Sequence, residues 1–171
     1  SSVVAQDAAL APAQNASKAL RAATQSMASA TKSTDRVTAL TQTIRALENG
    51  LQAMREGMRG VTIREREVRL KFDSQRDQIS RLRGVLQTLE RATTPLLLIH
   101  PTGPVGTARS GMMLSEITPG LQKQAEALRI QLEELSAIQV TQQIAQDDLT
   151  QGLKSLNQAR TELSQAVASR T

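Results

Sequence analysis

The stretch from Ala92 to Thr118, ATTPLLLIHPTGPVGTARSGMMLSEIT, lies where one long heptad pattern stops and another begins. Three of its residues, Pro95, Pro101 and Pro104, argue against one continuous helix through this region. Each proline lacks a backbone donor and disfavours helical geometry in the residue before it. The stretch therefore predicts an interruption at which the chain reverses between two helical arms.

Before this stretch, the predicted first coiled-coil arm covers residues 16–92. Its most regular part keeps an unbroken spacing of three and four residues, which is a strong coiled-coil pattern: Val37, Leu40, Ile44, Leu47, Leu51, Met54, Met58, Val61, Glu65, Val68, Phe72, Gln75, Ile79, Leu82, Leu86 and Leu89. Because Glu65 and Gln75 are polar, we expect the pairing to loosen there or the seam to widen for a third element.

The N-terminal end of the first arm is predicted to be its weakest part. Residues 1–15 are expected to form a flexible segment, with Pro12 in the first turn of the helix that follows. From Ala16 onward the seam carries mostly small side chains, which bury little apolar area. We therefore expect this end to be held by a partner.

The predicted second coiled-coil arm covers residues 119–171. Thr118 and Pro119 are typical of a helix N-cap followed by the first helical residue. Its seam is predicted to use Leu121, Ala125, Leu128, Leu132 and Leu135, and after a local skip Ile138, Gln142, Ala145, Leu149, Leu153, Leu156, Arg160, Leu163 and Val167. This arm is long enough to fold back along the regular part of the first arm.

The predicted fold class is all-α: a long antiparallel coiled-coil hairpin with a short helix and a Pro-rich segment at the turn. Residues 93–118 form this apolar turn region, and the spacing of Val105, Ala108, Met112 and Ile117 supports its short helix. Trp and Tyr are absent and aromatic residues make up 1% of the chain, so one elongated unit is favoured over a globular core.

The net charge of +5 raises nucleic acid or an anionic surface as a partner, but its distribution favours helix pairing. Residues 1–100 contain 15 Lys or Arg against 9 Asp or Glu, whereas residues 101–171 contain 6 against 7. A basic arm beside a slightly acidic arm helps to fix an antiparallel register. With no DNA-binding motif and no stacking aromatics, nucleic-acid binding is not expected.

Four glycines, Gly50, Gly57, Gly60 and Gly84, lie inside the first arm. Each costs about 1 kcal/mol relative to alanine in an exposed helix. They could provide flexibility or a close backbone contact with a partner. The interpretation we favour is that the long seam tolerates them.

The sequence offers no candidate for catalysis. It has one histidine, His100, and no cysteine, so neither a His-rich or Cys-rich metal site nor a nucleophile with a choice of bases can be built. The adjacent acidic pairs Glu133-Glu134 and Asp147-Asp148 point to different helix faces, and we expect them to be solvated. We predict a protein that is not an enzyme and has no catalytic, cofactor-binding or metal-binding residues.

The turn region carries more apolar residues than a simple hairpin loop requires. Methionines on an amphipathic helix suit an adaptable protein contact. The candidate partner-binding residues are Leu97, Leu98, Ile99, Met112, Met113, Leu114 and Ile117. Alternatively, the two apolar sets pack on one another and cap the hairpin.

The break TTPLLLIHP, the short apolar helix and the start of the second arm, PGLQKQAEALRIQLEEL, resemble the N-terminal coiled-coil region of EnvC-like murein hydrolase activators of the alphaproteobacterial type. The resemblance depends mainly on residues 93–135. It implies a periplasmic cell-division factor that docks on the periplasmic domain of FtsX, in the FtsEX complex. A LytM domain, absent from these 171 residues, would then activate cell-wall amidases.

The start of the sequence, SSVVAQDAALAPA, is typical of a mature exported chain, and the lack of cysteine fits the periplasm and the cytosol alike. No apolar run approaches the roughly 20 residues that span a bilayer, so no direct membrane insertion is expected. Two other functions remain open. The chain could be a self-associating structural scaffold, or an adaptor hairpin of a transport system, although the β segments that such adaptors need are not visible.

Overall fold

A computed structural model describes the backbone of residues 2–96 and 103–170. Three helices make up nearly all of this part: α1 (Ser2–Thr31), α2 (Arg36–Leu96) and α3 (Gly103–Ala168). No strand occurs in the described ranges. The all-α prediction is confirmed.

The chain forms two compact units, where the sequence predicted one. Unit 1 comprises residues 1–66 and 136–171, so it contains α1, the first part of α2 and the last part of α3. Unit 2 comprises residues 67–135, which are the rest of α2 and α3 with the connection between them.

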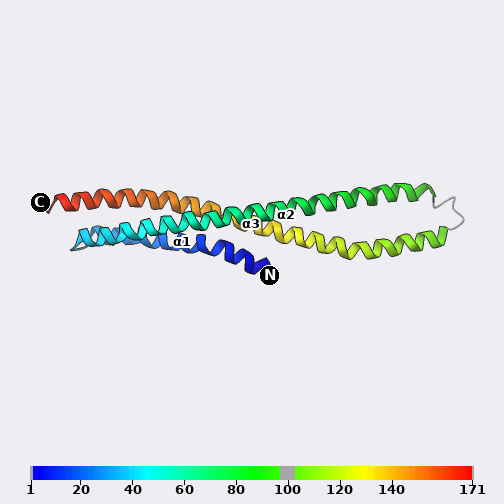
Figure 1. Ribbon diagram of the computed structural model, residues 1–171, viewed down its shortest axis with the longest axis horizontal. Helices are drawn as coiled ribbons and strands as arrows, with labels where there is room; N and C mark the ends of the chain where they lie inside the picture. Colours follow the sequence, from blue (N-terminus) through cyan, green and yellow to red (C-terminus); the bar gives the residue numbers. More distant parts are fainter. Residues whose placement is uncertain (1, 97–102, 171) are drawn as a thin grey trace. The chain divides into compact units, whose positions relative to one another are not determined.

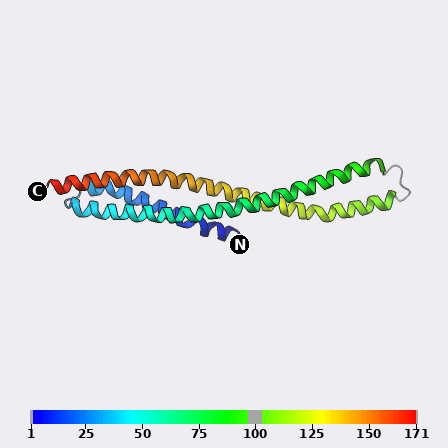
Figure 2. The same cartoon turned by 45° about the horizontal axis from the view of Figure 1, so that its top comes forward.

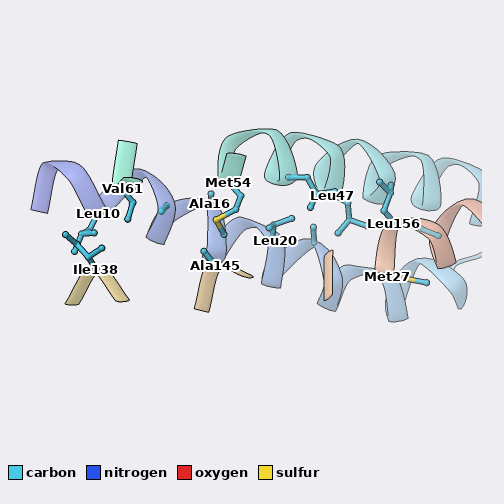
Figure 3. Close-up of a cluster of buried hydrophobic side chains, with 14 residues drawn as sticks. Leu10, Ala16, Leu20, Met27, Leu47, Met54, Val61, Ile138, Ala145 and Leu156 are labelled. Atoms are coloured by element: carbon cyan, nitrogen blue, oxygen red, sulfur yellow. The ribbon is translucent and has the colours of Figure 1, made fainter. Parts of the chain in front are cut away.

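Unit 1 is a bundle of three helices that lie side by side in both views (Figures 1 and 2). Its core is built in layers to which each helix contributes one residue. Figure 3 shows two such layers, formed by Leu10, Val61 and Ile138 and by Ala16, Met54 and Ala145. Burial of these apolar side chains is the main stabilising contribution to the unit.

Helix α1 runs antiparallel to α2 within unit 1. Leu20 lies against Gly50, whereas Ala13, seven residues earlier, lies against Gly57, seven residues later. Helices α1 and α3 run parallel, because Leu10 lies in one layer with Ile138 and Ala16 lies in another with Ala145 (Figure 3). Helices α2 and α3 are antiparallel, as the predicted hairpin requires, because Glu48 pairs with Arg160 and Glu65 pairs with Gln142.

The N-terminal part of the chain differs from the prediction. Residues 1–15 were predicted to be a flexible segment and 16–92 one arm, but α1 begins at Ser2 and ends at Thr31, and α2 begins at Arg36. Pro12 lies inside α1 instead of in its first turn. The small seam residues that were expected to need a partner are buried against α2 and α3 of the same chain, as Ala16, Ala23 and Ala30 illustrate.

The second arm also begins earlier than predicted. Helix α3 starts at Gly103 and continues without interruption through Pro119, so Thr118 and Pro119 do not begin a helix and no separate short helix precedes them. An internal proline removes one backbone hydrogen bond. The helical residues on both sides of Pro119 continue the helix despite this local cost.

The heptad pattern of α2 is confirmed as the packing face of that helix. The predicted seam residues from Val37 to Leu86 are all buried or half-buried. From Leu40 to Val61 most of them are buried in unit 1, whereas beyond Val68 they are only half-buried in unit 2. The difference follows the number of helices, because α1 contributes to unit 1 alone.

Candidate interaction surfaces

Glycines on α2 and α3 form the surface that receives α1. A Cβ atom built on Gly57 would lie 2.7 Å from the backbone nitrogen of Ala13, and one on Gly50 would lie 2.8 Å from Cδ2 of Leu20. Gly152 of α3 faces the same leucine, at 3.2 Å from Cδ2. The absence of side chains at these positions lets α1 approach closely.

The favoured interpretation of the glycines is therefore wrong for Gly50 and Gly57, which make close contacts. At Gly60 and Gly84 an added Cβ would meet nothing within 4 Å, which agrees with simple tolerance. The sequence feature that could have indicated these close contacts is the spacing of Gly50 and Gly57, which are seven residues apart and share one face of α2.

Ion pairs between helices accompany the apolar core of unit 1. Arg21 of α1 pairs with Asp148 of α3 at 3.1 Å. Helices α2 and α3 are joined by Arg36 with Glu162 at 2.9 Å and by Glu48 with Arg160 at 2.8 Å. These pairs are partly exposed, so they contribute more to register than to stability.

The seam between α2 and α3 becomes polar toward the end of unit 1 and through unit 2. Within unit 1, Gln142 donates a hydrogen bond to the Glu65 carboxylate at 2.6 Å. In unit 2, the Oε1 atoms of Gln75, Gln124 and Gln131 are buried and have no hydrogen-bond partner among the described residues. An unsatisfied buried acceptor costs about 1 to 3 kcal/mol, so this seam is weaker than an apolar one.

The register of α3 in unit 2 differs from the predicted one. Gln131 is 6% exposed and belongs to the interior, whereas Leu132, predicted for the seam, is 53% exposed. The spacing from Leu121 through Gln124, Leu128 and Gln131 reaches Ile138 without any skip. The regular apolar pattern of α3 that follows Ile138 therefore sets the register of the whole helix, and this register places Gln124 and Gln131 in the seam.

This register leaves apolar side chains on the outside of unit 2. Leu70 is 67% exposed and Val85 is 56% exposed on α2, while Ile130 and Leu132 are exposed on α3. Glu134, which was predicted to be solvated, is buried instead. Unit 2 therefore combines a partly polar interior with apolar residues on its surface.

The predicted partner-binding residues fall at positions 97–99 of the sequence and in the first part of α3. Leu97, Leu98 and Ile99 lie outside the described residues, as does His100. The remaining four, Met112, Met113, Leu114 and Ile117, belong to the helical backbone of α3, and the structure describes nothing of their side chains. Their role in binding stays a prediction.

Neighbouring groups shift the pKa values of Asp35, Glu126 and Arg129. Hydrogen bonds from Thr38 hold the pKa of the Asp35 carboxyl below its ordinary value of 3.8. Arg129 lowers the pKa of Glu126 by donating hydrogen bonds to its carboxylate, and Glu126 in turn raises the pKa of Arg129. Arg129 also pairs with Glu133, one helical turn further on.

Nowhere in the part of the chain that the structure describes do three or more His, Cys, Asp or Glu side chains gather so as to hold a metal ion. None of its helices has an apolar stretch long enough to cross a membrane.

Comparison with known proteins gave no match to any protein-family model, any curated protein or any solved structure.

Proposed function

We propose that this chain is the non-enzymatic regulatory coiled-coil region of an EnvC-like murein hydrolase activator and that it docks on the periplasmic domain of FtsX. The proposal depends on the resemblance carried by residues 93–135. The observation that supports it most is that all of this stretch lies in unit 2, where α2 ends at Leu96 and α3 begins at Gly103.

The composition of unit 2 also suits partner binding. Exposed Leu70, Val85 and Leu132 offer apolar contact area on both of its helices. The unsatisfied amide oxygens of Gln75 and Gln131 weaken the pairing between those helices. A pair of helices that is held loosely can adjust when a partner binds.

The mechanism that we propose is mechanical. ATP hydrolysis by FtsE moves FtsX, and the docked unit 2 receives that movement. Unit 1, with three helices around an apolar core, acts as the stiffer body. The movement controls a LytM domain that is not among these 171 residues, and a cell-wall amidase is reached only through that domain. The proposed compartment is the periplasm.

Calorimetric titration with the FtsX periplasmic domain of the same organism tests the proposal. The unaltered chain is expected to bind with micromolar affinity. Replacing Met112, Met113 and Leu114 together by serine is expected to abolish the binding heat. The matched control Val140→Ser changes an exposed apolar residue of α3 in unit 1 and is expected to bind normally.

Each contrary result removes a different part of the proposal. No binding by the unaltered chain contradicts docking on FtsX. Normal binding by the triple variant, with its helical circular dichroism intact, contradicts the assignment of the site to Met112, Met113 and Leu114.

A further inference from the structure

The turn between α1 and α2 interrupts the helix, yet one of the two seam positions of the heptad continues through it. Ala23 and Ala30 of α1 are buried, and Val37 of α2 follows seven residues after Ala30 and is half-buried. The other position moves by one residue, because Thr34 continues the α1 seam whereas Leu40, only six residues later, belongs to the α2 seam. One straight helix through residues 2–66 would therefore keep the seam residues within one broad face.

No residue of this turn forbids a helix. Its sequence, Lys32-Ser33-Thr34-Asp35, contains neither glycine nor proline, and none of the described residues has a positive φ. A turn that is required by covalent geometry would normally carry one of these signals. The break between α1 and α2 is thus maintained by non-covalent interactions.

Few interactions hold the turn in place. The Asp35 carboxylate caps α2, because it accepts hydrogen bonds from the Thr38 hydroxyl at 2.6 Å and the Thr38 backbone N–H at 3.3 Å. Arg170 also pairs with Asp35. The hydrogen bonds within the turn, from Lys32 and Ser33 to carbonyls at the end of α1, are long at 3.3 Å.

Beside the turn, α1 and α2 pack through a small apolar cluster that includes Ala30 and Leu40. A pocket of about 410 Å³ lies there and is lined by small and polar residues, namely Ser26, Ser29, Ala30, Ser33, Ala39, Gln42, Thr43 and Ala46. The close approaches of α1 to Gly50 and Gly57 lie further from the turn, at Leu20 and Ala13.

The register of the α1–α2 pair is centred on the turn. Leu20 meets Gly50 and Ala13 meets Gly57, so the residue numbers add to 70 in both pairs and their midpoint is residue 35. Two straight helices in antiparallel arrangement with this register would cross at Asp35 of each copy. Every contact of α1 with α2 could then form between two chains in the same way as within one.

We propose that this chain forms a domain-swapped dimer, in which α1 and α2 straighten into one helix and α1 of each copy occupies the glycine-lined surface of the other. The partner is a second copy of this chain, because α1 already matches Gly50, Gly57 and Gly152 in shape and Asp148 in charge. Exchange of an identical element costs little beyond association, since the same contacts form again. The dimer would therefore use the same contact surfaces between α1 and the other two helices as the monomer does.

Variants of the turn test this proposal through the molar mass. In the double variant Thr34→Leu/Asp35→Ala, the new leucine continues the apolar seam of α1 and the N-cap of α2 is lost, so the straight helix is favoured. In Arg36→Pro, proline occupies the first helical position of α2, which suits the closed turn and breaks a straight helix. The control Arg36→Ala removes the ion pair with Glu162 alone.

Light scattering after size exclusion is expected to give twice the monomer mass of 18.5 kDa for the double variant and 18.5 kDa for Arg36→Pro. The unaltered chain and Arg36→Ala are expected to show both species, with the dimer increasing from micromolar to millimolar concentration. A double variant that remains at 18.5 kDa at every concentration contradicts the proposal.

Crosslinking then identifies the surface that a dimer uses. The chain has no cysteine, so Arg21→Cys/Asp148→Cys introduces the only two thiols, at a pair that lies 3.1 Å apart in the present residues. A short bismaleimide should give covalent dimers in the Thr34→Leu/Asp35→Ala background and crosslinked monomers in the Arg36→Pro background. If the dimer gives crosslinked monomers only, α1 still packs within its own chain and the two copies associate through another surface. That result would contradict the proposed exchange of α1. No FtsX is present in these measurements, so they are independent of the proposed function.

Discussion

Units 1 and 2 are built from the same two helices, yet their interiors differ. In unit 1, α1 completes an apolar core around Leu20, Leu47 and Ile138. In unit 2, α2 and α3 pair alone over a seam that includes Gln75 and Gln131. A heptad pattern thus specifies which residues face inward, but the third helix and the polarity of the seam determine how firmly they are held.

The substitution with the largest expected effect is Leu20→Ala, which removes the side chain that fits against Gly50 and Gly152. Truncation of a buried leucine costs about 2 to 5 kcal/mol, and the loss here falls on the attachment of α1. Limited proteolysis should cleave α1 much faster in the variant. The matched control Leu132→Ala alters an exposed leucine of unit 2 and should leave cleavage of α1 unchanged.

Two glycine substitutions are expected to act in opposite directions. Gly57→Ala gains about 1 kcal/mol of helix propensity, but its Cβ meets the Ala13 backbone, and such overpacking costs about 1 to 3 kcal/mol. We expect a net loss of about 1 kcal/mol by urea unfolding. Gly60→Ala has free space for its Cβ and should gain about 1 kcal/mol. Equal stabilisation by both substitutions would show that α1 does not pack closely on Gly57.

In unit 2, Gln131→Leu is expected to strengthen the seam. The change removes a buried acceptor that has no hydrogen-bond partner and adds apolar area, for a gain of about 1 kcal/mol. The thermal unfolding temperature should rise, whereas Gln139→Leu, on the exposed face of α3, should change it little. A lower unfolding temperature for Gln131→Leu would mean that the glutamine makes a favourable interaction in the seam.

The smallest expected effect is a pH dependence of the turn between α1 and α2. Because hydrogen bonds from Thr38 lower the pKa of Asp35 in the folded chain, the cap stabilises the fold fully above the ordinary value of 3.8. That contribution is lost as the pH falls below 3.8 through the lower folded value. Melting curves on both sides of this pH should show a steeper decrease for the unaltered chain than for Asp35→Asn, whose amide does not titrate there. Parallel curves would exclude this role of Asp35.

Much of the fold could be predicted from the spacing of apolar residues. The seam from Val37 to Leu86 and the antiparallel hairpin followed from the heptad pattern and the proline-rich interruption. The turn at residues 32–35 could not be predicted, because it lacks glycine and proline and the seven-residue spacing of Ala23, Ala30 and Val37 continues through it. Sequence reasoning therefore joined α1 to α2 as one arm.

The interior of unit 2 was predicted less well for a different physical reason. Gln131 and Leu132 are adjacent, and hydrophobicity favours the leucine as the seam residue. The register of α3 continues unbroken through Ile138, and in this register Gln131 faces the interior while Leu132 is exposed. The candidate partner-binding residues came from apolar excess in the turn region, and the described side chains do not extend to them.

The central claim, that unit 1 is the firmly held body and unit 2 the compliant one, is tested most directly by hydrogen exchange of the unaltered chain, followed by mass spectrometry. Backbone amides in residues 37–66 and 138–166 are predicted to exchange more slowly than those in residues 67–96 and 103–135. Equal or greater protection of the segments from unit 2 would contradict this account.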